Sequence, residues 1–255
     1  MIGVFDSGIG GLSVLAALRS AYPAADLLYY ADTANLPYGG RSPALIRCFA
    51  KEAGKRFGGW GADCVQVACG TVSSLALDDF AAAAGCPVSG VVLPVVDAIS
   101  RDGRRRVLIL STEATARSRV FDAALTAKRP GVATLSLGCP LFVPLVENGF
   151  FAGNDPALLS LAGRILAPGQ TFFPDAILLG CTHFRLLAPL ISRLFPGVPL
   201  YDCGKAAAGA VPERFGGGNG TLRVYVSDDP ERFRLAAERT GSLSPGVPIA
   251  SAAGE

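Results

Sequence analysis

Two cysteines share a local context that suits proton transfer. Cys69 follows the mostly apolar run 65–68, Cys181 follows the apolar run 177–179, and a threonine comes soon after each cysteine. In both segments a buried strand is expected to end near the cysteine, and a helix is expected to begin after it. Because backbone N–H groups and the dipole at a helix start favour an anion, each thiol is expected to have a pKa below the ordinary value of about 8.5. The alternative is a small apolar side chain that only packs at a crowded turn.

His183 is the sole histidine of the chain and lies two residues after Cys181. Its imidazole can exchange a proton with a thiol, and a structural capping role is the alternative. Glu147 is an acid in an apolar helical stretch, so it is either a surface residue or the carboxylate that orients His183. Cys69, Cys181 and His183 carry zinc-binding side chains, but their spacing matches no common zinc pattern, so no metal site is predicted.

The amino-terminal segment predicts a strand over residues 2–5, then a glycine-rich turn and a helix. Such a turn presents backbone N–H groups to a carboxylate or a phosphate. Nucleotide binding is not favoured, because the glycines do not follow the dinucleotide pattern and no P-loop lysine follows them. Asp6 and Ser7 are expected to cap the helix in the simpler interpretation. Alternatively, the Asp6 carboxylate serves as a base or as the partner of a substrate ammonium group.

The elements that must position these residues alternate short apolar runs with helical patterns, which predicts an α/β fold with mostly parallel sheets. Strands are expected at residues 2–5, 27–31, 64–68, 88–92, 107–110, 133–137, 176–179, 198–201 and 222–226. Helices are expected at residues 12–22, 43–57, 72–83, 115–128, 156–166 and 186–195.

So many strands would make one very wide sheet, so we expect two similar α/β domains. The first is assigned to residues 1–96 plus 208–255, and the second to residues 97–207. Open α/β sheets bind ligands beyond the carboxyl ends of their strands, so a cleft between the domains would receive both thiols. Residues 215–220 are expected to form a flexible link, and the tail after Thr240 is expected to be frayed.

Composition excludes several classes of protein. Of the 255 residues 50% are hydrophobic and 17% are charged, which is not a disordered composition, and the net charge of +2 favours neither nucleic acid nor an anionic membrane as a partner. Uninterrupted apolar stretches are far shorter than the roughly 20 residues that span a bilayer. The amino terminus has no basic region typical of a signal peptide, so a cytoplasmic location is expected. The 7 cysteines include no C-x-x-C pair, which predicts reduced thiols.

Four motifs, at residues 6–14, 37–39, 68–71 and 179–184, together resemble the glutamate racemases of the aspartate/glutamate racemase family. The likeness covers nearly the whole chain in order. It implies an isomerase that interconverts L- and D-glutamate without a cofactor and provides D-glutamate for peptidoglycan synthesis. It also implies that Cys69 and Cys181 lie on opposite faces of the substrate α-carbon, where two thiols can exchange the roles of base and acid.

The resemblance assigns roles to the neighbours of the thiols. Asp6 would assist Cys69, and His183, held by Glu147, would assist Cys181. The implied substrate contacts are Asp6, Ser7, Tyr38, Gly39, Gly70, Thr71, Thr182 and His183. The implied partner is a small amino acid, glutamate, and because related enzymes are commonly dimers, a homodimer is a further expectation.

Gly70 departs from the family, which usually has asparagine directly after the first cysteine. Loss of a buried polar contact worth about 1 to 3 kcal/mol would weaken substrate binding or alter which amino acid is accepted. A water molecule and a larger substrate are two explanations for the missing side chain. The alternatives to glutamate racemisation are a racemase for aspartate or another amino acid, and a paralogue that binds an amino acid or a protein partner without turnover.

Overall fold

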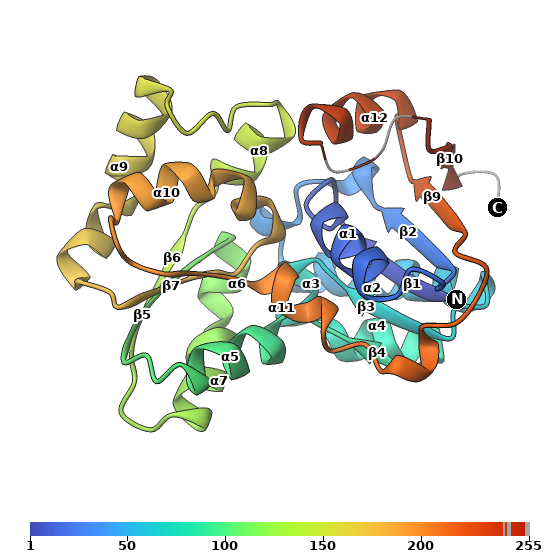
Figure 1. Cartoon of the computed structure of the whole chain (residues 1–255), viewed down its shortest axis with the longest axis horizontal. Helices are drawn as coiled ribbons and strands as arrows, with labels where there is room; N and C mark the ends of the chain where they lie inside the picture. Colours follow the sequence, from blue (N-terminus) through green and yellow to red (C-terminus); the bar gives the residue numbers. More distant parts are fainter. Residues whose placement is uncertain (242, 244–245, 253–255) are drawn as a thin grey trace.

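The computed structural model describes residues 1–241, 243 and 246–252, and its strands form two separate sheets (Figure 1). The first sheet has the strand order β10-β9-β2-β1-β3-β4, and the second has the order β6-β5-β7-β8. The first comprises β1 (Ile2–Asp6), β2 (Leu27–Ala31), β3 (Cys64–Val67), β4 (Val88–Ser89), β9 (Leu222–Val226) and β10 (Ile249–Ser251). The second comprises β5 (Arg106–Ser111), β6 (Ala133–Gly138), β7 (Ala176–Leu179) and β8 (Leu200–Asp202). The described neighbouring strands pair in parallel, which confirms the predicted fold class.

Helices cover both faces of each sheet. The first sheet packs α1 (Leu12–Ala21) and α12 (Pro230–Arg239) on one face, and α2 (Pro43–Gly59), α3 (Gly70–Leu75) and α4 (Leu77–Ala84) on the other. The second packs α8 (Phe142–Glu147), α9 (Pro156–Phe172) and α10 (Ala188–Leu194) on one face, and α5 (Val92–Arg101), α7 (Val120–Lys128) and α11 (Cys203–Ala208) on the other. Helix α6 (Glu113–Ser118) lies between the sheets, against α3 and β6.

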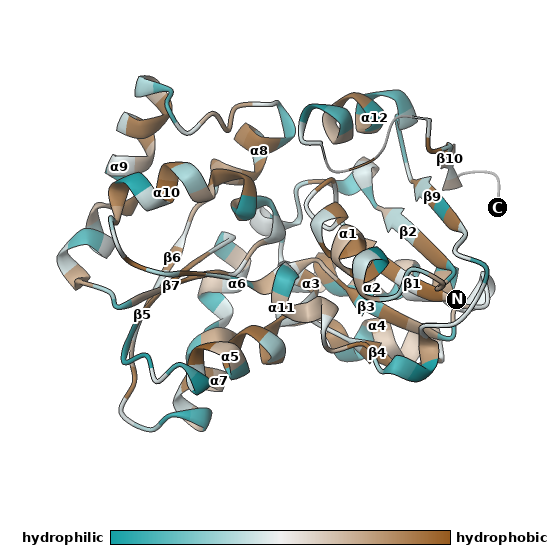
Figure 2. Ribbon diagram, in the orientation of Figure 1, coloured by the Kyte–Doolittle hydropathy of each residue, from teal (hydrophilic) through white to brown (hydrophobic). Residues whose placement is uncertain are grey.

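Burial on both faces explains why the central strands β1, β2, β3 and β7 are mostly apolar, with every residue buried (Figure 2). In β1 every residue is buried, and Ile2 and Val4 belong to the apolar cluster that includes α1. Phe5 belongs to the opposite cluster, where its ring centroid lies 5.2 Å from that of Phe80 and 6.5 Å from that of Phe57. The strand therefore holds its carboxyl end, where the site residues begin, in a rigid position.

Each predicted strand overlaps a strand of the structure, but the prediction for residues 88–92 is wrong beyond Ser89. Residues Val92, Val95, Val96 and Ile99 recur at helical spacing and are the buried positions of α5. The predicted helix 115–128 is two helices, because Arg119 adopts a left-handed φ of 57° between α6 and α7.

The carboxyl-terminal tail also differs from the prediction. Strand β10 (Ile249–Ser251) pairs with β9, so this part of the tail is not frayed. Helix α12 precedes it and was not among the predicted helices. The part of that prediction that concerns residues 242, 244–245 and 253–255 lies outside the described residues.

The chain crosses between the sheets twice. Strand β9 returns to the first sheet beside β2, as predicted for residues 222–226. The predicted boundary between residues 96 and 97 falls inside α5, which packs with α7 and α11 against the second sheet. The predicted link 215–220 is joined to the loop before β2, since Asp26 accepts a hydrogen bond from the backbone of Asn219 at 3.1 Å. The division into residues 1–96 plus 208–255 and residues 97–207 stays a prediction. Of the helices in the described part of the chain, none is long and apolar enough to cross a bilayer.

Candidate active site

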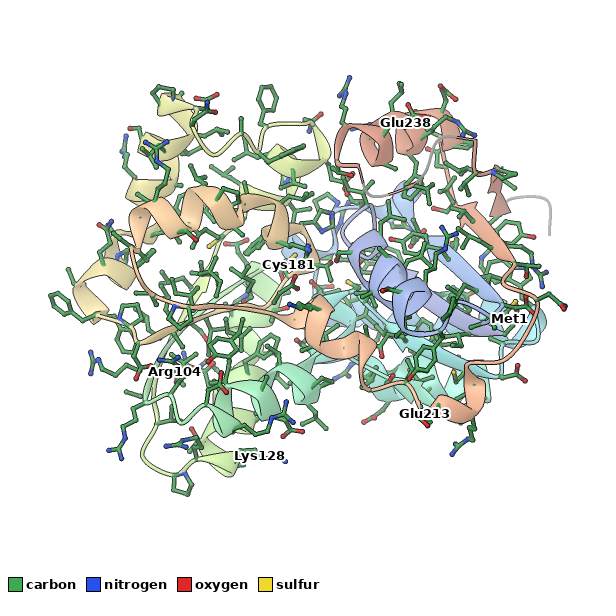
Figure 3. The ribbon with its side chains drawn as sticks, viewed as in Figure 1. Met1, Arg104, Lys128, Cys181, Glu213 and Glu238 are labelled. Carbon is green, nitrogen blue, oxygen red and sulfur yellow. The ribbon has the colours of Figure 1, made fainter. Side chains whose placement is uncertain are left out.

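The two cysteines follow strands at the points where the strand order of each sheet reverses. In the first sheet β1 lies between β2 and β3; Asp6 ends β1, and Cys69 comes just after β3. In the second sheet β5 lies between β6 and β7, and Cys181 comes just after β7. Such switch points are the usual ligand sites of open α/β sheets. Figure 3 shows Cys181 between the two halves of the molecule, where the two switch points meet.

One cavity of about 10 Å³ joins these switch points. Its lining consists of Asp6, Ser7, Pro37, Tyr38, Gly39, Cys69, Gly70, Thr71, Thr112, Val143, Cys181, Thr182 and His183. The structure thus brings together all the residues for which the sequence predicted a substrate contact. A volume of this size holds about one water molecule, so the lining groups nearly fill the site in this conformation.

Three lining residues, Pro37, Thr112 and Val143, were not among the predicted site residues, although Pro37 lies inside the motif at residues 37–39. Thr112 follows β5 at the second switch point, and that position was the signal that would have found it. Its hydroxyl lies 3.0 Å from that of Thr71 and 3.1 Å from that of Thr115, so it links the two halves of the site. Val143 lies in α8 and carries no polar group, so nothing in the sequence marked it.

The surroundings of Cys69 favour its neutral thiol form. Its side chain is buried, and its Sγ donates to the Ser7 hydroxyl at 3.9 Å. Burial, together with the charge of Asp6, raises the pKa of the Cys69 thiol to about 12. The expectation of a lowered pKa is therefore wrong for this residue, because loss of water disfavours the thiolate more than the start of the short helix α3 favours it.

Asp6 connects the two sheets and does not cap a helix. Its Oδ1 accepts from the Gly8 backbone N–H at 2.9 Å, and its Oδ2 accepts from the Thr182 hydroxyl at 3.0 Å. The N-cap of α1 is Gly11, and no side chain caps that helix. Burial raises the pKa of Asp6, although the charge of His183 opposes this shift. A buried carboxylate whose pKa is raised is suited to accept a proton during a reaction.

His183 lies between Cys181 and Glu147. The Nδ1 atom of His183 is 3.8 Å from the Cys181 Sγ, and its Nε2 is 2.6 Å from the Glu147 Oε1. Burial lowers the pKa of His183, but the hydrogen bonds and charges of Cys181 and Glu147 outweigh it, so the pKa lies well above 6.5. The pKa of Glu147 is lowered, because the hydrogen bond and charge of His183 outweigh the effect of burial.

This pair therefore consists of an imidazolium and a carboxylate. Both ring nitrogens of His183 then carry a proton, so one can donate to Glu147 and the other to a Cys181 thiolate. The contact expected between Glu147 and His183 is present, and the surface alternative for Glu147 is wrong, since its side chain is only 12% exposed. The same Oε1 accepts a hydrogen bond from the Ile9 backbone N–H at 3.1 Å. This bond connects Glu147, at the end of α8, to the turn after β1.

Tyr38 lines the cavity and is held in place by a hydrogen bond and by aromatic neighbours. Its hydroxyl donates to the Asp32 carboxylate at 2.5 Å, and its ring is fully buried beside Phe49 and Phe5. This bond fixes the orientation of the Tyr38 side chain. The same loop carries Gly39, which packs against Thr112. The position of Gly39 in the cavity wall thus depends on a rigid neighbour.

The donor atoms of the site suit proton transfer. In residues 1–241, 243 and 246–252 no three His, Cys, Asp or Glu side chains are grouped so as to hold a metal ion. The seven cysteines all lie in the described part of the chain, and none of them is paired there. Two thiols, the His183 imidazolium and the Asp6 carboxylate line one cavity, and Glu147 contacts His183 from outside it. These groups can donate and accept protons.

Comparisons with known proteins agree with this geometry. The family model described as Asp/Glu/Hydantoin racemase matches residues 2–211. The chain is similar to the glutamate racemase of Thermus thermophilus, with 39% identity over 94% of this chain and 92% of that protein. It is 37% identical to the glutamate racemase of Aquifex aeolicus over 89% of this chain and 88% of that protein. The solved structure of Francisella tularensis glutamate racemase in complex with D-glutamate has a TM-score of 0.88 at 29% identity, covering 98% of this chain and 95% of that chain.

Proposed function

The chain belongs to the Asp/Glu/Hydantoin racemase family, and from this premise we propose that Cys69 and Cys181 are the two groups with which it interconverts L- and D-glutamate. The protein is an amino-acid racemase, and therefore an isomerase. The observation that carries the assignment of the thiols is that both line one cavity, each at the carboxyl end of a buried strand of a different sheet.

Inversion at the α-carbon requires a base on one face and an acid on the other. A thiolate removes the α-proton and becomes a thiol, and the opposite thiol gives its own proton to the carbanion and becomes a thiolate. No net proton is consumed, and the enzyme ends with the two roles exchanged. The reverse reaction starts from that exchanged state, so Cys69 and Cys181 each serve as the base for one enantiomer.

The surroundings of the two thiols differ. The buried Cys69 begins as the proton donor, because burial and the charge of Asp6 hold it in the neutral form. The Cys181 Sγ lies 3.8 Å from the Nδ1 atom of His183, with which it can exchange a proton. Asp6 accepts the proton when Cys69 must become the base, and Glu147 acts through His183 as a positioning residue.

The carbanion formed at the α-carbon is stabilised by donors that surround the substrate carboxylate. The hydroxyls of Ser7, Thr71 and Thr182 all line the cavity. In a site with little water, fixed donors stabilise developing charge more strongly than they would in solution. The remaining parts of the proposal are a cytoplasmic location, supply of D-glutamate to peptidoglycan synthesis, and a homodimer.

Incubation of the purified protein with each enantiomer of glutamate and of aspartate, without added cofactor, tests the function. We expect the circular dichroism of L-glutamate and of D-glutamate to decay to zero at comparable rates. If aspartate or another amino acid racemises and glutamate does not, the substrate assignment is wrong and the thiol assignment stands. If no amino acid racemises, the protein is a binding paralogue.

A further inference from the structure

Gly70, the first residue of α3, lies against the loop that carries Cys181. A Cβ built on Gly70 would lie 2.3 Å from the Gly180 carbonyl oxygen, and real Cβ atoms essentially never come closer than 3.0 Å to a neighbour. From the sequence alone, a water molecule and a larger substrate were the two explanations for what fills the place of the missing side chain. Neither explanation holds in this conformation, because a backbone carbonyl of the second sheet's loop occupies that place.

The Gly180 carbonyl has no room to retreat. The backbone N–H of Gly180 donates to the Leu110 carbonyl at 2.7 Å, which fixes the loop to β5. On its other side, a Cβ at Gly180 itself would lie 2.8 Å from the Phe121 ring, so the loop is packed against the core of the second sheet. A side chain at position 70 would therefore move the two loops apart as units.

Three other glycines after the strands of the first sheet make the same kind of contact. A Cβ on Gly8 would lie 2.2 Å from the Glu147 Oε1, and a Cβ on Gly10 would lie 2.5 Å from the His183 Nδ1. A Cβ on Gly39 would lie 2.5 Å from Thr112. All these neighbours belong to elements of the second sheet.

Hydrogen bonds between the same two sets of loops complete the contact. Thr182 donates to Asp6 at 3.0 Å, and the Thr71 and Thr112 hydroxyls lie 3.0 Å apart. The cavity they enclose, about 10 Å³, is too small for an amino acid. Substrate therefore enters only when these loops separate, and the reactive geometry depends on how closely they return.

We propose that Gly70 is a positioning residue: its missing side chain lets the loops of Cys69 and Cys181 close on each other and so sets the separation of the two thiols. The effect on closure follows from the packing alone, whereas the effect on turnover rests on the proposed two-thiol function. Any Cβ at position 70 forces the loops apart by at least 0.7 Å, from 2.3 Å to 3.0 Å.

Such a displacement matters because a shift of about 1 Å in reacting groups can lower a rate by about a hundredfold. We expect Gly70→Ala to lower kcat by about tenfold or more, with a smaller change in KM, because the polar groups that bind substrate remain. Gly70→Asn introduces the residue usual in the family, but we expect it to lower kcat further, since the larger side chain meets the same carbonyl.

Alkylation of individual thiols by iodoacetamide, followed by peptide mass spectrometry, tests closure directly. Cys69 and Cys181 are 4% and 6% exposed. Cys64 is 5% exposed and begins β3, at the opposite end of the strand from Cys69, so it reports on global unfolding. In Gly70→Ala we expect about tenfold faster alkylation of Cys69 and Cys181, and an unchanged rate for Cys64. Gly40→Ala is the matched control, because a Cβ on Gly40 would have no neighbour within 4 Å.

Equal acceleration of Cys69, Cys181 and Cys64 would mean that Gly70 has only a structural role, and unchanged rates would mean that it does not govern closure. If Gly70→Ala does not fold, Gly39→Ala opens the same group of contacts from the Thr112 side, and the thiol comparison is made on that variant. If wild-type protein racemises no amino acid, the proposed function fails, while the alkylation rates still decide the role of Gly70.

Discussion

Replacing Glu147 by glutamine removes the charge that faces His183 while keeping an oxygen acceptor of the same size. In the wild-type protein the Glu147 Oε1 lies 2.6 Å from the His183 Nε2, and the two side chains are 12% and 2% exposed. Burial by itself lowers the pKa of His183, and the partners Cys181 and Glu147 raise it. Without the carboxylate, we expect this pKa to fall.

The size of the fall follows from the strength of the contact. A hydrogen bond to a charged group contributes about 1.5 to 3 kcal/mol, and one pKa unit corresponds to about 1.4 kcal/mol, so the pKa of His183 should drop by about one to two units. Glu147→Gln should also lower the free energy of unfolding by about 2 kcal/mol near pH 6.

The pH dependence of that destabilisation has a definite sign. The raised pKa of His183 gives stability that is fully present below its unfolded pKa of 6.5 and is lost as the pH rises through its folded pKa. The lowered pKa of Glu147 gives stability that is present above its unfolded pKa of 4.5 and is lost as the pH falls through its folded pKa. The difference between wild type and Glu147→Gln should therefore be largest between pH 4.5 and 6.5.

Proton NMR titration measures this pKa without resonance assignment, because His183 is the only histidine. The Cε1–H shift of the wild type should titrate above pH 6.5, and that of Glu147→Gln should titrate at lower pH. Glu238→Gln, on the exposed side of α12, is the matched control and should titrate as the wild type does. A wild-type pKa at or below 6.5, or equal values in wild type and Glu147→Gln, would refute the reasoning.

Two further predictions concern the thiols and Tyr38. Cys69→Ala and Cys181→Ala should each lower the racemisation rate by about 10² to 10⁴, the usual contribution of one acid/base group, whereas a metal chelator should leave the wild-type rate unchanged; a variant within tenfold of wild type would remove that thiol from the mechanism. Tyr38→Phe removes the hydroxyl that donates to the buried Asp32 at 2.5 Å, so chemical denaturation should show a free energy of unfolding lower by about 1 to 3 kcal/mol, and an unchanged value would contradict a structural role for this bond.

The sequence was informative about the strands because parallel strands covered on both faces are continuous apolar runs. Strand β7 (Ala176–Leu179) has the predicted limits, and the polar residues just after such strands are the ones that meet in the cavity. The topological switch points then fix which strand ends are neighbours. The placement of Cys69 and Cys181 at one cavity could thus be predicted from the local sequence and from the general rule that ligands bind beyond the carboxyl ends of strands in open α/β sheets.

Features that depend on tertiary contacts could not be predicted in this way. The pKa of Cys69 is set by burial and by Asp6, and neither is visible in the residues around Cys69. The reason for a glycine at position 70 is the Gly180 carbonyl, which reaches it only through packing of the two sheets. Strand β10 forms because β9 offers it a free edge, although its residues Ile249–Ser251 follow a segment that resembles a frayed tail.

Racemisation in heavy water tests the two-thiol mechanism most directly. L-glutamate and D-glutamate are incubated separately with the protein, and the α-proton of each enantiomer is followed by NMR after chiral separation. A two-thiol mechanism predicts that the product enantiomer carries deuterium from its first appearance, while the remaining substrate keeps its α-proton, because the thiol on the opposite face delivers a solvent-derived deuteron. Deuterium that enters the substrate as fast as the product, or a product that keeps the original proton, would contradict it.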